Sequence, residues 1–309
     1  MENPANSSHK KGLLAGFVLL IALSVGFIAL ISFLPFGGGS SGETIKSIGK
    51  DKIGVVEVFG TIMTADETVK QIKNYANDKA IKAIIIRIDS PGGAVAPSQE
   101  IHDAILAARR KKKVVASMAT LGASGGYYIA VAADKIICNP GTLTGSIGVI
   151  MNLMNVQELM GKIGVQPMVV KSGEFKDTGS AFRPMTEREK KVVQEMIDDV
   201  YGQFVTAVAK GRNMPETKVR ELADGRVYTG NQAKNNGMVD ALGGMEEAVK
   251  LTAQLAGISG EPALVRHEEK MLWLKELMSE KTSLAGKFDW LMNEVAVHKP
   301  GVYYLWSMN

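Results

Sequence analysis

Short aliphatic runs alternate with longer amphipathic runs along most of the chain, beginning at Ile53. Aliphatic runs of about four to eight residues predict strands, whereas apolar residues at three- or four-residue spacing predict helices. We expect strands at 53–60, 83–90, 114–119, 135–138 and 165–170, and helices at 67–79, 98–110, 125–133, 156–163, 216–223 and 245–255. Strands and helices that alternate in this way indicate an α/β fold with a largely parallel sheet.

A long helix is predicted to begin after Thr186. Thr186 and Glu189 have the spacing of a capping box, in which each side chain satisfies a backbone N–H group of the first helical turn. One face of this helix should pack on the core until Gly211, because apolar residues recur there at helical spacing. These residues are Val193, Ile197, Val200, Phe204 and Val208.

Residues Gly12–Leu34 form a run of 23 residues without a charge. As a helix, such a run is long enough to cross a hydrocarbon core about 30 Å thick. A cleaved signal peptide is the alternative, but its apolar region is about 7 to 15 residues long. Lys10 and Lys11 precede the run, whereas the next lysine is Lys46. We therefore expect a single-pass anchor in the cell membrane, with the N-terminus cytoplasmic and the body extracytoplasmic.

Composition divides the chain into five parts. Residues 1–11 are the cytoplasmic N-terminus, 12–34 the transmembrane helix, and 35–52 a linker that contains the sequence GGGSSG. Residues 53–258 form the folded domain. Beyond Gly260 the composition shifts to Trp, Met and Lys, so we expect residues 259–309 to form a C-terminal tail outside the sheet.

Charge and cysteine content exclude several classes of function. The net charge is +4, and no basic stripe is interleaved with aromatic residues, so the pattern does not favour a nucleic-acid partner. Cys138 is the single cysteine, which excludes a disulfide framework and a cysteine-based metal site.

The stretch Val114–Asp134 combines a strand, a turn of small residues and a helical run, with Ser124 at the apex of the turn. Backbone N–H groups at the start of a helix stabilise negative charge beside the serine oxygen. Gly122, Gly125 and Gly126 leave room for a substrate backbone and permit strained turn angles. Ser124 is therefore a candidate nucleophile, and a simple helix cap is the alternative.

A serine hydroxyl needs a base within hydrogen-bonding reach. Residues 122–126 satisfy the pattern G-x-S-x-G, and the order serine, aspartate, histidine is that of an α/β-hydrolase. The candidate partners for such a triad are Asp224, Asp240, His267 and His298. Both histidines lie in segments that look peripheral, but the pattern alone leaves this alternative open.

A lysine kept neutral by burial is the other possible base. Lys176 lies in a Gly/Ser loop with Phe175 and Phe182 nearby, after the strand expected at 165–170. Active sites of α/β proteins form at the carboxyl ends of parallel strands, which makes Lys176 the candidate and Lys171 its substitute.

Two further elements rich in small residues follow buried strands. Gly93, in the sequence DSPGG, could join Gly125 in donating backbone N–H groups to an oxyanion. Ser146, in the sequence TLTGSIGV, could hold the lysine amine by a hydrogen bond. Each of these elements, taken alone, is also typical of an ordinary turn.

Together these sequences resemble the signal peptide peptidases of the short, single-repeat type (SppA, peptidase family S49), which are membrane-anchored serine proteases. The resemblance runs from about Ile53 to Ala256 and includes the anchor. The matching sequences are DSPGG at 89–93, GASGGYYIA at 122–130, ADKI at 133–136, TLTGSIGV at 142–149, KSGEFKD at 171–177 and DGRVYTGNQA at 224–233.

This resemblance implies a crotonase/ClpP-like fold of repeated β-β-α units and a protease domain at 53–258 that uses a Ser-Lys dyad without a metal or organic cofactor. It implies Ser124 as nucleophile and Lys176 as general base. Ser146 would orient the lysine, and Gly93 with Gly125 would form the oxyanion hole. The Clp subunit instead uses a histidine base, and the region around Ser146 contains none.

The family also implies partners. Its members form ring-like homo-oligomers, which for a single-repeat chain implies an octamer at the lipid bilayer. The implied substrates are cleaved signal peptides and other apolar, membrane-associated peptides. A serine esterase of the α/β-hydrolase type and a non-catalytic crotonase-fold scaffold that binds apolar peptides are the two alternatives.

Overall fold

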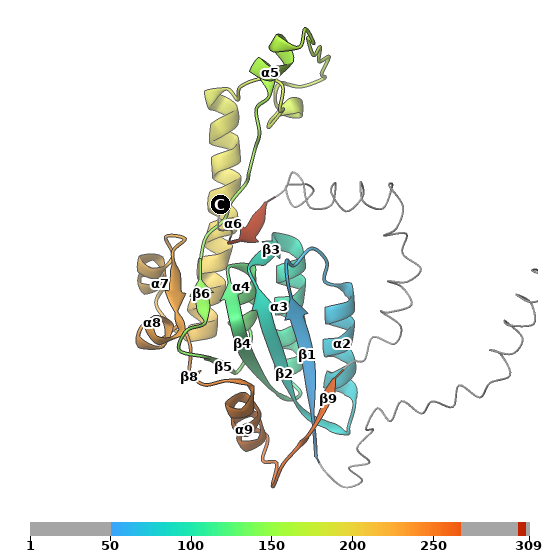
Figure 1. The fold of residues 1–309 in the computed structure, drawn as a ribbon, viewed down its shortest axis with the longest axis vertical. Helices are drawn as coiled ribbons and strands as arrows, with labels where there is room; N and C mark the ends of the chain where they lie inside the picture. Colours follow the sequence, from blue (N-terminus) through green and yellow to red (C-terminus); the bar gives the residue numbers. More distant parts are fainter. Residues whose placement is uncertain (1–50, 267–301, 307–309) are drawn as a thin grey trace, which may run out of the picture. The chain divides into compact units, whose positions relative to one another are not determined.

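A computed structural model of the chain describes residues 51–266 and 302–306 (Figure 1). The predicted membrane anchor at 12–34 lies outside these residues, and no helix within them is long and apolar enough to cross a bilayer. The described elements are β1 (Lys52–Phe59), α2 (Asp66–Asn77), β2 (Ile81–Ser90), β3 (Gly92–Ala94), α3 (Val95–Arg109), β4 (Lys113–Ala123), α4 (Gly125–Ala130), β5 (Lys135–Cys138), β6 (Leu143–Gly145), α5 (Gln157–Lys162), η1 (Glu174–Asp177), α6 (Glu187–Arg212), α7 (Glu216–Leu222), β7 (Val227–Thr229), α8 (Gly230–Asn235), β8 (Ala241–Leu242), α9 (Met245–Leu255), β9 (Ala263–Arg266) and β10 (Tyr303–Leu305).

The main sheet has eight described strands. Its principal path is β7-β6-β4-β2-β1-β9, with β5 pairing β4 and β8 beside it. Every pair is parallel except β6 with β7. The predicted α/β arrangement with largely parallel strands is therefore confirmed.

The sheet is covered on both faces, as the aliphatic run of β2 indicates. Ile84, Ile86 and Ile88 are fully buried in a core cluster with residues of α2, α3, α4 and α6. Ala83 and Ile85, which alternate with them, pack with residues of α9 in a second cluster. Burying a large aliphatic side chain contributes about 1.5–3 kcal/mol to the free energy of folding. Because β2 buries several such side chains on both faces, it is a stable support for the loops at its carboxyl end.

Helix α6 begins with the predicted capping box. The Glu189 backbone N–H donates to the Thr186 hydroxyl, and the Thr186 backbone N–H donates to the Glu189 carboxylate. Phe204 is fully buried in the carboxyl-terminal half, where α6 packs on the body. The helix ends at Arg212, one residue beyond Gly211, because Asn213 adopts the left-handed conformation.

Residues 151–183, which we call the arm, contain α5 and η1 and lie at the amino-terminal end of α6 (Figure 1). The prediction of a strand at 165–170 is wrong, because this segment has no regular secondary structure and pairs with no strand within the described residues. Met168 and Val170 are 90% and 95% exposed. An aliphatic run predicts a strand only where an open sheet edge lies beside it, and the arm reaches none.

The expectation that the tail lies outside the sheet is also wrong. Strand β9 pairs with β1 in parallel and covers the edge that β1 would otherwise expose. Strand β10 pairs antiparallel with β3 in a separate two-stranded sheet. The C-terminal region therefore contributes to the body at two places, one of them beside the glycine loop Gly92–Gly93.

Candidate active site

Ser124 occupies a strained turn between β4 and α4. Its φ and ψ angles are 52° and −116°, a conformation that costs a non-glycine residue on the order of 1–3 kcal/mol. The Ser124 N–H donates to the Gly145 carbonyl at 2.7 Å, and its own carbonyl accepts from the Tyr128 N–H at 2.8 Å. These two bonds fix the backbone on both sides of Ser124.

The hydroxyl of Ser124 does not cap α4. The side chain is 1% exposed, and it makes no capping hydrogen bond within the described residues. A serine that only capped the helix would accept a hydrogen bond from the first turn. The strain, the burial and the missing cap together favour a chemical role for Ser124.

Backbone amides of two loops converge beside Ser124. A Cβ atom on Gly125 would lie 3.1 Å from the Gly93 nitrogen, and one on Gly92 would lie 2.5 Å from the Gly125 nitrogen. A Cβ atom on Gly93 would lie 2.1 Å from the Ile62 carbonyl oxygen. Only glycine therefore allows β3 to approach α4 this closely, and the approach brings together the two amides predicted to form an oxyanion hole.

Ser146 adjoins the same turn. It follows Gly145, whose carbonyl accepts from Ser124, and it has a positive φ of 49°. Its N–H donates to the Arg226 carbonyl at 2.9 Å. The Ser146 side chain lines an open cavity of about 380 Å³ that Tyr201 also lines. A side chain from outside could therefore reach Ser146 through this cavity.

Lys176 lies in η1 on the arm and is exposed. The arm is tied to the start of α6, since Arg183 forms ion pairs with both Asp177 and Glu189. A helix rises about 1.5 Å per residue, so roughly 25 Å of α6 separate its start from Phe204, which packs beside α4. One copy of the chain brings together Ser124, Gly93, Gly125 and Ser146, but not Lys176.

Lys171 has a partner in the arm. Its ammonium lies 2.6 Å from a carboxylate oxygen of Asp177 and donates to the Glu174 carbonyl at 2.8 Å. Hydrogen bonds from Arg183 and Lys171 hold the pKa of the Asp177 carboxyl far below its usual range. Lys171 is thus committed to a structural ion pair, whereas Lys176 has no ion pair within the part of the chain that the structure describes.

The partners of a Ser-His-Asp triad are not assembled at Ser124. Both candidate histidines, His267 and His298, lie outside the described residues. Asp224 pairs with Arg226. Asp240 lies 2.8 Å from Arg212. Burial raises the pKa of the Asp240 carboxyl, but hydrogen bonds from Arg212, the Ile136 backbone and Lys135 outweigh it and hold that pKa below its usual value.

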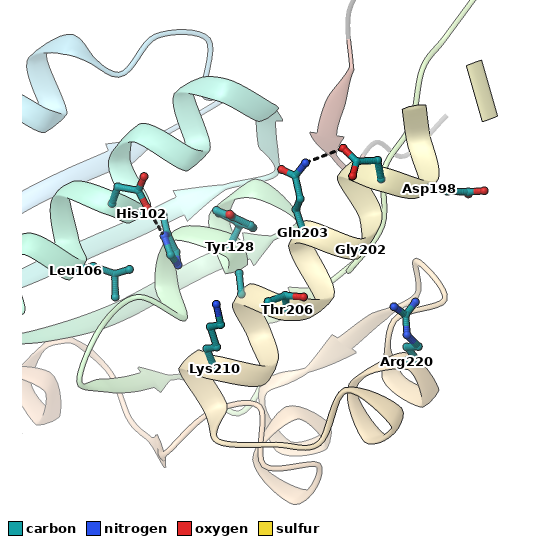
Figure 2. Close-up of a pocket in the computed structure, with 12 residues that line it drawn as sticks. His102, Leu106, Tyr128, Asp198, Gly202, Gln203, Thr206, Lys210 and Arg220 are labelled. Carbon is teal, nitrogen blue, oxygen red and sulfur yellow. Dashed lines mark hydrogen bonds and ion pairs between the residues drawn. The ribbon is translucent and has the colours of Figure 1, made fainter. Parts of the chain in front are cut away.

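An open groove of about 680 Å³ lies between α3 and α6 (Figure 2). Its lining includes His102, Tyr128 and Lys210 but none of the predicted site residues. Burial lowers the pKa of His102, which lies 3.1 Å from Asp103. No group of three or more potential metal-ligating side chains occurs among residues 51–266 and 302–306.

Sequence reasoning missed a peptide strand at the candidate site. Strand β10 runs along β3, with Tyr304 opposite Gly93. The Tyr304 carbonyl oxygen lies 2.0 Å from the position that a Cβ atom on Gly92 would take. The aromatic run after Pro300 was the available signal, but nothing in it specifies a partner 200 residues away.

Comparison with known proteins gives two overlapping family matches. The model of peptidase family S49 matches residues 107–259, and that of Clp protease matches residues 47–142. The second match and the parallel-rich sheet fit the crotonase/ClpP-like fold.

Individual relatives cover most of the chain. "Putative protease slr0021" from Synechocystis is 46% identical over 69% of this chain and 77% of its own length. "Putative protease MJ0651" from Methanocaldococcus jannaschii is 36% identical over 82% of this chain and 85% of its own. "Putative signal peptide peptidase SppA" from Enterococcus faecium is 44% identical over 58% of this chain and 52% of its own.

Proposed function

The chain belongs to peptidase family S49, and from this premise we propose that it is a serine endopeptidase with Ser124 as nucleophile and Lys176 as general base. The observation that carries this proposal is the turn at Ser124. A buried, strained serine without a capping role lies where the Gly93 and Gly125 amides converge. These are the parts that acyl transfer needs, namely a positioned nucleophile and N–H groups for the developing oxyanion.

The proposed reaction needs only Ser124, Lys176, the peptide and water. The neutral Lys176 amine takes the proton of Ser124 as the serine oxygen bonds to the carbonyl carbon of the peptide. The resulting ammonium then gives its proton to the leaving amine as the C–N bond breaks. Water hydrolyses the serine ester, with the same lysine as base, which restores the free hydroxyl.

We propose that the lysine comes from a second copy of the chain. Lys176 is exposed at the far end of α6, so its own Ser124 is out of reach. The surface around it is apolar, and such surfaces on soluble domains are typical of interfaces. The exposed large apolar side chains of the arm are those of Leu153, Met154, Leu159, Ile163, Val165, Met168, Val169, Val170, Phe175 and Phe182.

Docking of this arm on a neighbouring body would bury Lys176 and bring its amine to the cavity beside Ser146. The Ser146 hydroxyl can then accept a hydrogen bond from the amine and direct its lone pair toward Ser124. Repeating the same contact from copy to copy generates a closed ring, which accords with the octamer that the family resemblance implies.

The proposed substrates are apolar peptides, including cleaved signal peptides, at the outer face of the cell membrane. The uncharged run at 12–34 supports the anchor, and Lys10 and Lys11 support the orientation. The pairing of β10 with β3 supports a peptide rather than a small ester as substrate, because it is a backbone interaction that an extended peptide makes. It does not by itself separate a peptidase from a peptide-binding scaffold.

Covalent labelling separates those two. A fluorophosphonate probe should label the assembled protein, and mass spectrometry should place the adduct on Ser124. The variant Ser124→Ala should lose the label, whereas Ser172→Ala, which changes an exposed serine of the arm, should keep it. Assembled protein that takes no label and cuts no apolar peptide would contradict the proposal and favour the scaffold.

A further inference from the structure

The amino edge of the main sheet carries a strong positive charge. The segment that joins α2 to β2 and the segment that joins α3 to β4 lie side by side there, because Ala83 of β2 pairs with Lys113 of β4. We call residues 78–82 and 110–113 the basic edge. It contains Lys79, Lys82, Arg110, Lys111, Lys112 and Lys113. Asp78 is its one acidic residue, so the basic edge has a formal charge of +5, whereas the whole chain carries +4.

Two of these lysines are fixed by neutral groups, which leaves their charge uncompensated. The Lys112 ammonium donates to two backbone carbonyls at the end of α2, and the Lys111 ammonium donates to the Asn77 side-chain oxygen at 2.7 Å. Burial lowers the pKa of Lys112, and attraction to Asp78 raises it. The charges of Lys82 and Lys111 lower it further, so the three ammonium groups lie close enough to repel one another.

The other four charges are open to a partner. Lys79, Lys82, Arg110 and Lys113 are exposed, and none of them forms an ion pair within the described part of the chain. The Asp134 carboxylate accepts from the Val114 N–H, but it is paired with Arg109. Like charges held together without counter-charges repel one another, and a negatively charged surface relieves that repulsion.

The chain that leads to the proposed anchor enters the body at this same edge. Lys52, the first residue of β1, pairs with Ile81, which precedes Lys82. Figure 1 shows the start of β1 at the lower end of the sheet and β3 at its upper end. In the sequence, residues 35–50 separate the body from the uncharged run at 12–34, and a flexible linker of that length spans about 20–24 Å. An anchor at 12–34 therefore tethers the body by its basic edge.

We propose that the basic edge docks on the surface of an anionic phospholipid bilayer and orients the body so that Ser124 faces away from the lipid. Each Lys or Arg near such a surface strengthens association about fivefold. A tether at the same edge raises the effective concentration of the basic residues at the headgroups. This inference rests on the membrane anchor in the proposed function.

Docking in this orientation sets the height of the candidate active site above the bilayer. Strand β4 begins at Lys113 in the basic edge and ends at Ala123, beside Ser124. At about 3.3 Å per residue, its length places Ser124 about 35 Å from that edge. A peptide then has to leave the bilayer before one of its bonds reaches Ser124, which favours released peptides over embedded ones as substrates.

Energy transfer from the body to labelled lipid tests the docking. The full chain is reconstituted in bilayers of phosphatidylcholine, with or without phosphatidylglycerol, that carry an acceptor dye on the headgroups. A donor dye is attached through Ala80→Cys in the basic edge or through Thr64→Cys, which follows β1 at the carboxyl edge. Both positions are exposed, whereas Cys138 is buried and should not react.

The lipid and the salt concentration should both change the transfer. From position 80 we expect transfer at least about twofold higher in the anionic bilayer. Salt at 1 M shortens the screening length to about 3 Å, so it should remove the difference. Transfer from position 64 should be weaker in both bilayers.

Two sets of substitutions locate the contact. One set removes the exposed charges of the basic edge and should abolish the lipid dependence, namely Lys79→Gln, Lys82→Gln, Arg110→Gln and Lys113→Gln together. The matched control removes four exposed lysines that pair within their own helices and should keep the dependence, namely Lys70→Gln, Lys191→Gln, Lys218→Gln and Lys250→Gln. If the first set does not fold, the comparison of lipids and salt in the otherwise unchanged chain still decides.

The outcomes separate this inference from the proposed function. Equal transfer in both bilayers, or a lipid dependence that both sets of substitutions leave unchanged, would overturn the docking and leave the peptidase and its anchor intact. Stronger transfer from position 64 than from position 80 would also overturn it. A full chain that does not float with either bilayer would contradict the anchor and the docking together, whereas labelling of Ser124 tests the peptidase independently.

Discussion

The body around Ser124 and the arm that carries Lys176 have opposite characters. In the body, Ser124 is 1% exposed and its backbone is fixed by Gly145 and Tyr128. In the arm, Val170 is 95% exposed, and the described segment 165–170 pairs with no strand. The nucleophile is preorganised by a core that one chain completes, whereas the proposed base lies on a surface that one chain leaves uncovered.

If the proposal is right, a single copy of the chain has a nucleophile but no base. A nucleophile without its base is almost inactive, because a serine hydroxyl is a weak nucleophile at neutral pH. If the base arrives only when copies assemble, peptide hydrolysis is coupled to assembly. The body with Ser124 and the arm with Lys176 then each fold before the two come together in the assembly.

The largest expected effect comes from the base itself. Lys176→Ala should reduce turnover by about a thousandfold, within the usual range for general-base removal, and Lys176→Arg should do the same because arginine stays protonated. Lys171→Ala is the matched control in the same arm. Full turnover in Lys176→Ala would remove the arm from the chemistry.

The apolar surface of the arm should matter next. Val170→Glu places a charge on the proposed interface and should convert oligomers to smaller species in light scattering, with turnover lowered about tenfold or more. Leu106→Glu is the control, because Leu106 is also exposed but lies on α3 of the body, away from the arm. Equal loss of assembly in both variants would show that the arm has no special role.

The ion pair between Arg183 and Glu189, which ties the arm to α6, gives a pH-dependent prediction. Hydrogen bonds from Arg183 lower the pKa of Glu189 to about 2, below the value of about 4.3 for an unfolded chain. The depressed pKa means that Glu189 stabilises the arm fully above pH 4.3 or so, and that this contribution is lost as the pH falls through about 2.

Hydrogen exchange should detect that loss. Between pH 4 and pH 2 we expect amides of the arm to lose protection before those of β2. Arg183→Met should produce the same loss at neutral pH and lower turnover severalfold. Lys190→Met is the exposed control from the same region, because Lys190 pairs with Glu187 within α6. Uniform protection of arm and body down to pH 2 would contradict this account.

The smallest effect concerns the tail. Strand β10 pairs with β3 as an extended substrate peptide would, so we expect it to compete with added peptide. A chain that ends at Val302 should hydrolyse a subsaturating peptide a few times faster than the full chain, through a lower KM rather than a higher kcat. An unchanged KM would mean that β10 leaves the site when copies assemble.

Much of the body could be predicted because its signals are local. The buried run of β2, the capping box at Thr186 and Glu189, and the strand-turn-helix around Ser124 each depend on residues close together in sequence. The α9 bounds match the expected 245–255. The apolar periodicity of such segments already specifies which faces must be buried.

The errors share a different cause. Residues 165–170 have the composition of a strand but no partner edge, while β9 and β10 find partners about 200 residues away in sequence. Pairing over such distances depends on which edges the finished fold leaves open. The exposed position of Lys176 is equally invisible in the sequence, because its loop resembles those that follow sheet strands.

Mixing two inactive variants tests the central claim most directly. Ser124→Ala supplies an intact arm, and Lys176→Ala supplies an intact nucleophile. If the site forms between copies, co-assembled equal amounts should regain activity at about a quarter of the sites, because a random ring places the two intact halves together that often. Each variant assembled alone should remain inactive. Co-assembled rings that remain as inactive as either variant would show that the dyad, if it forms, lies within one chain.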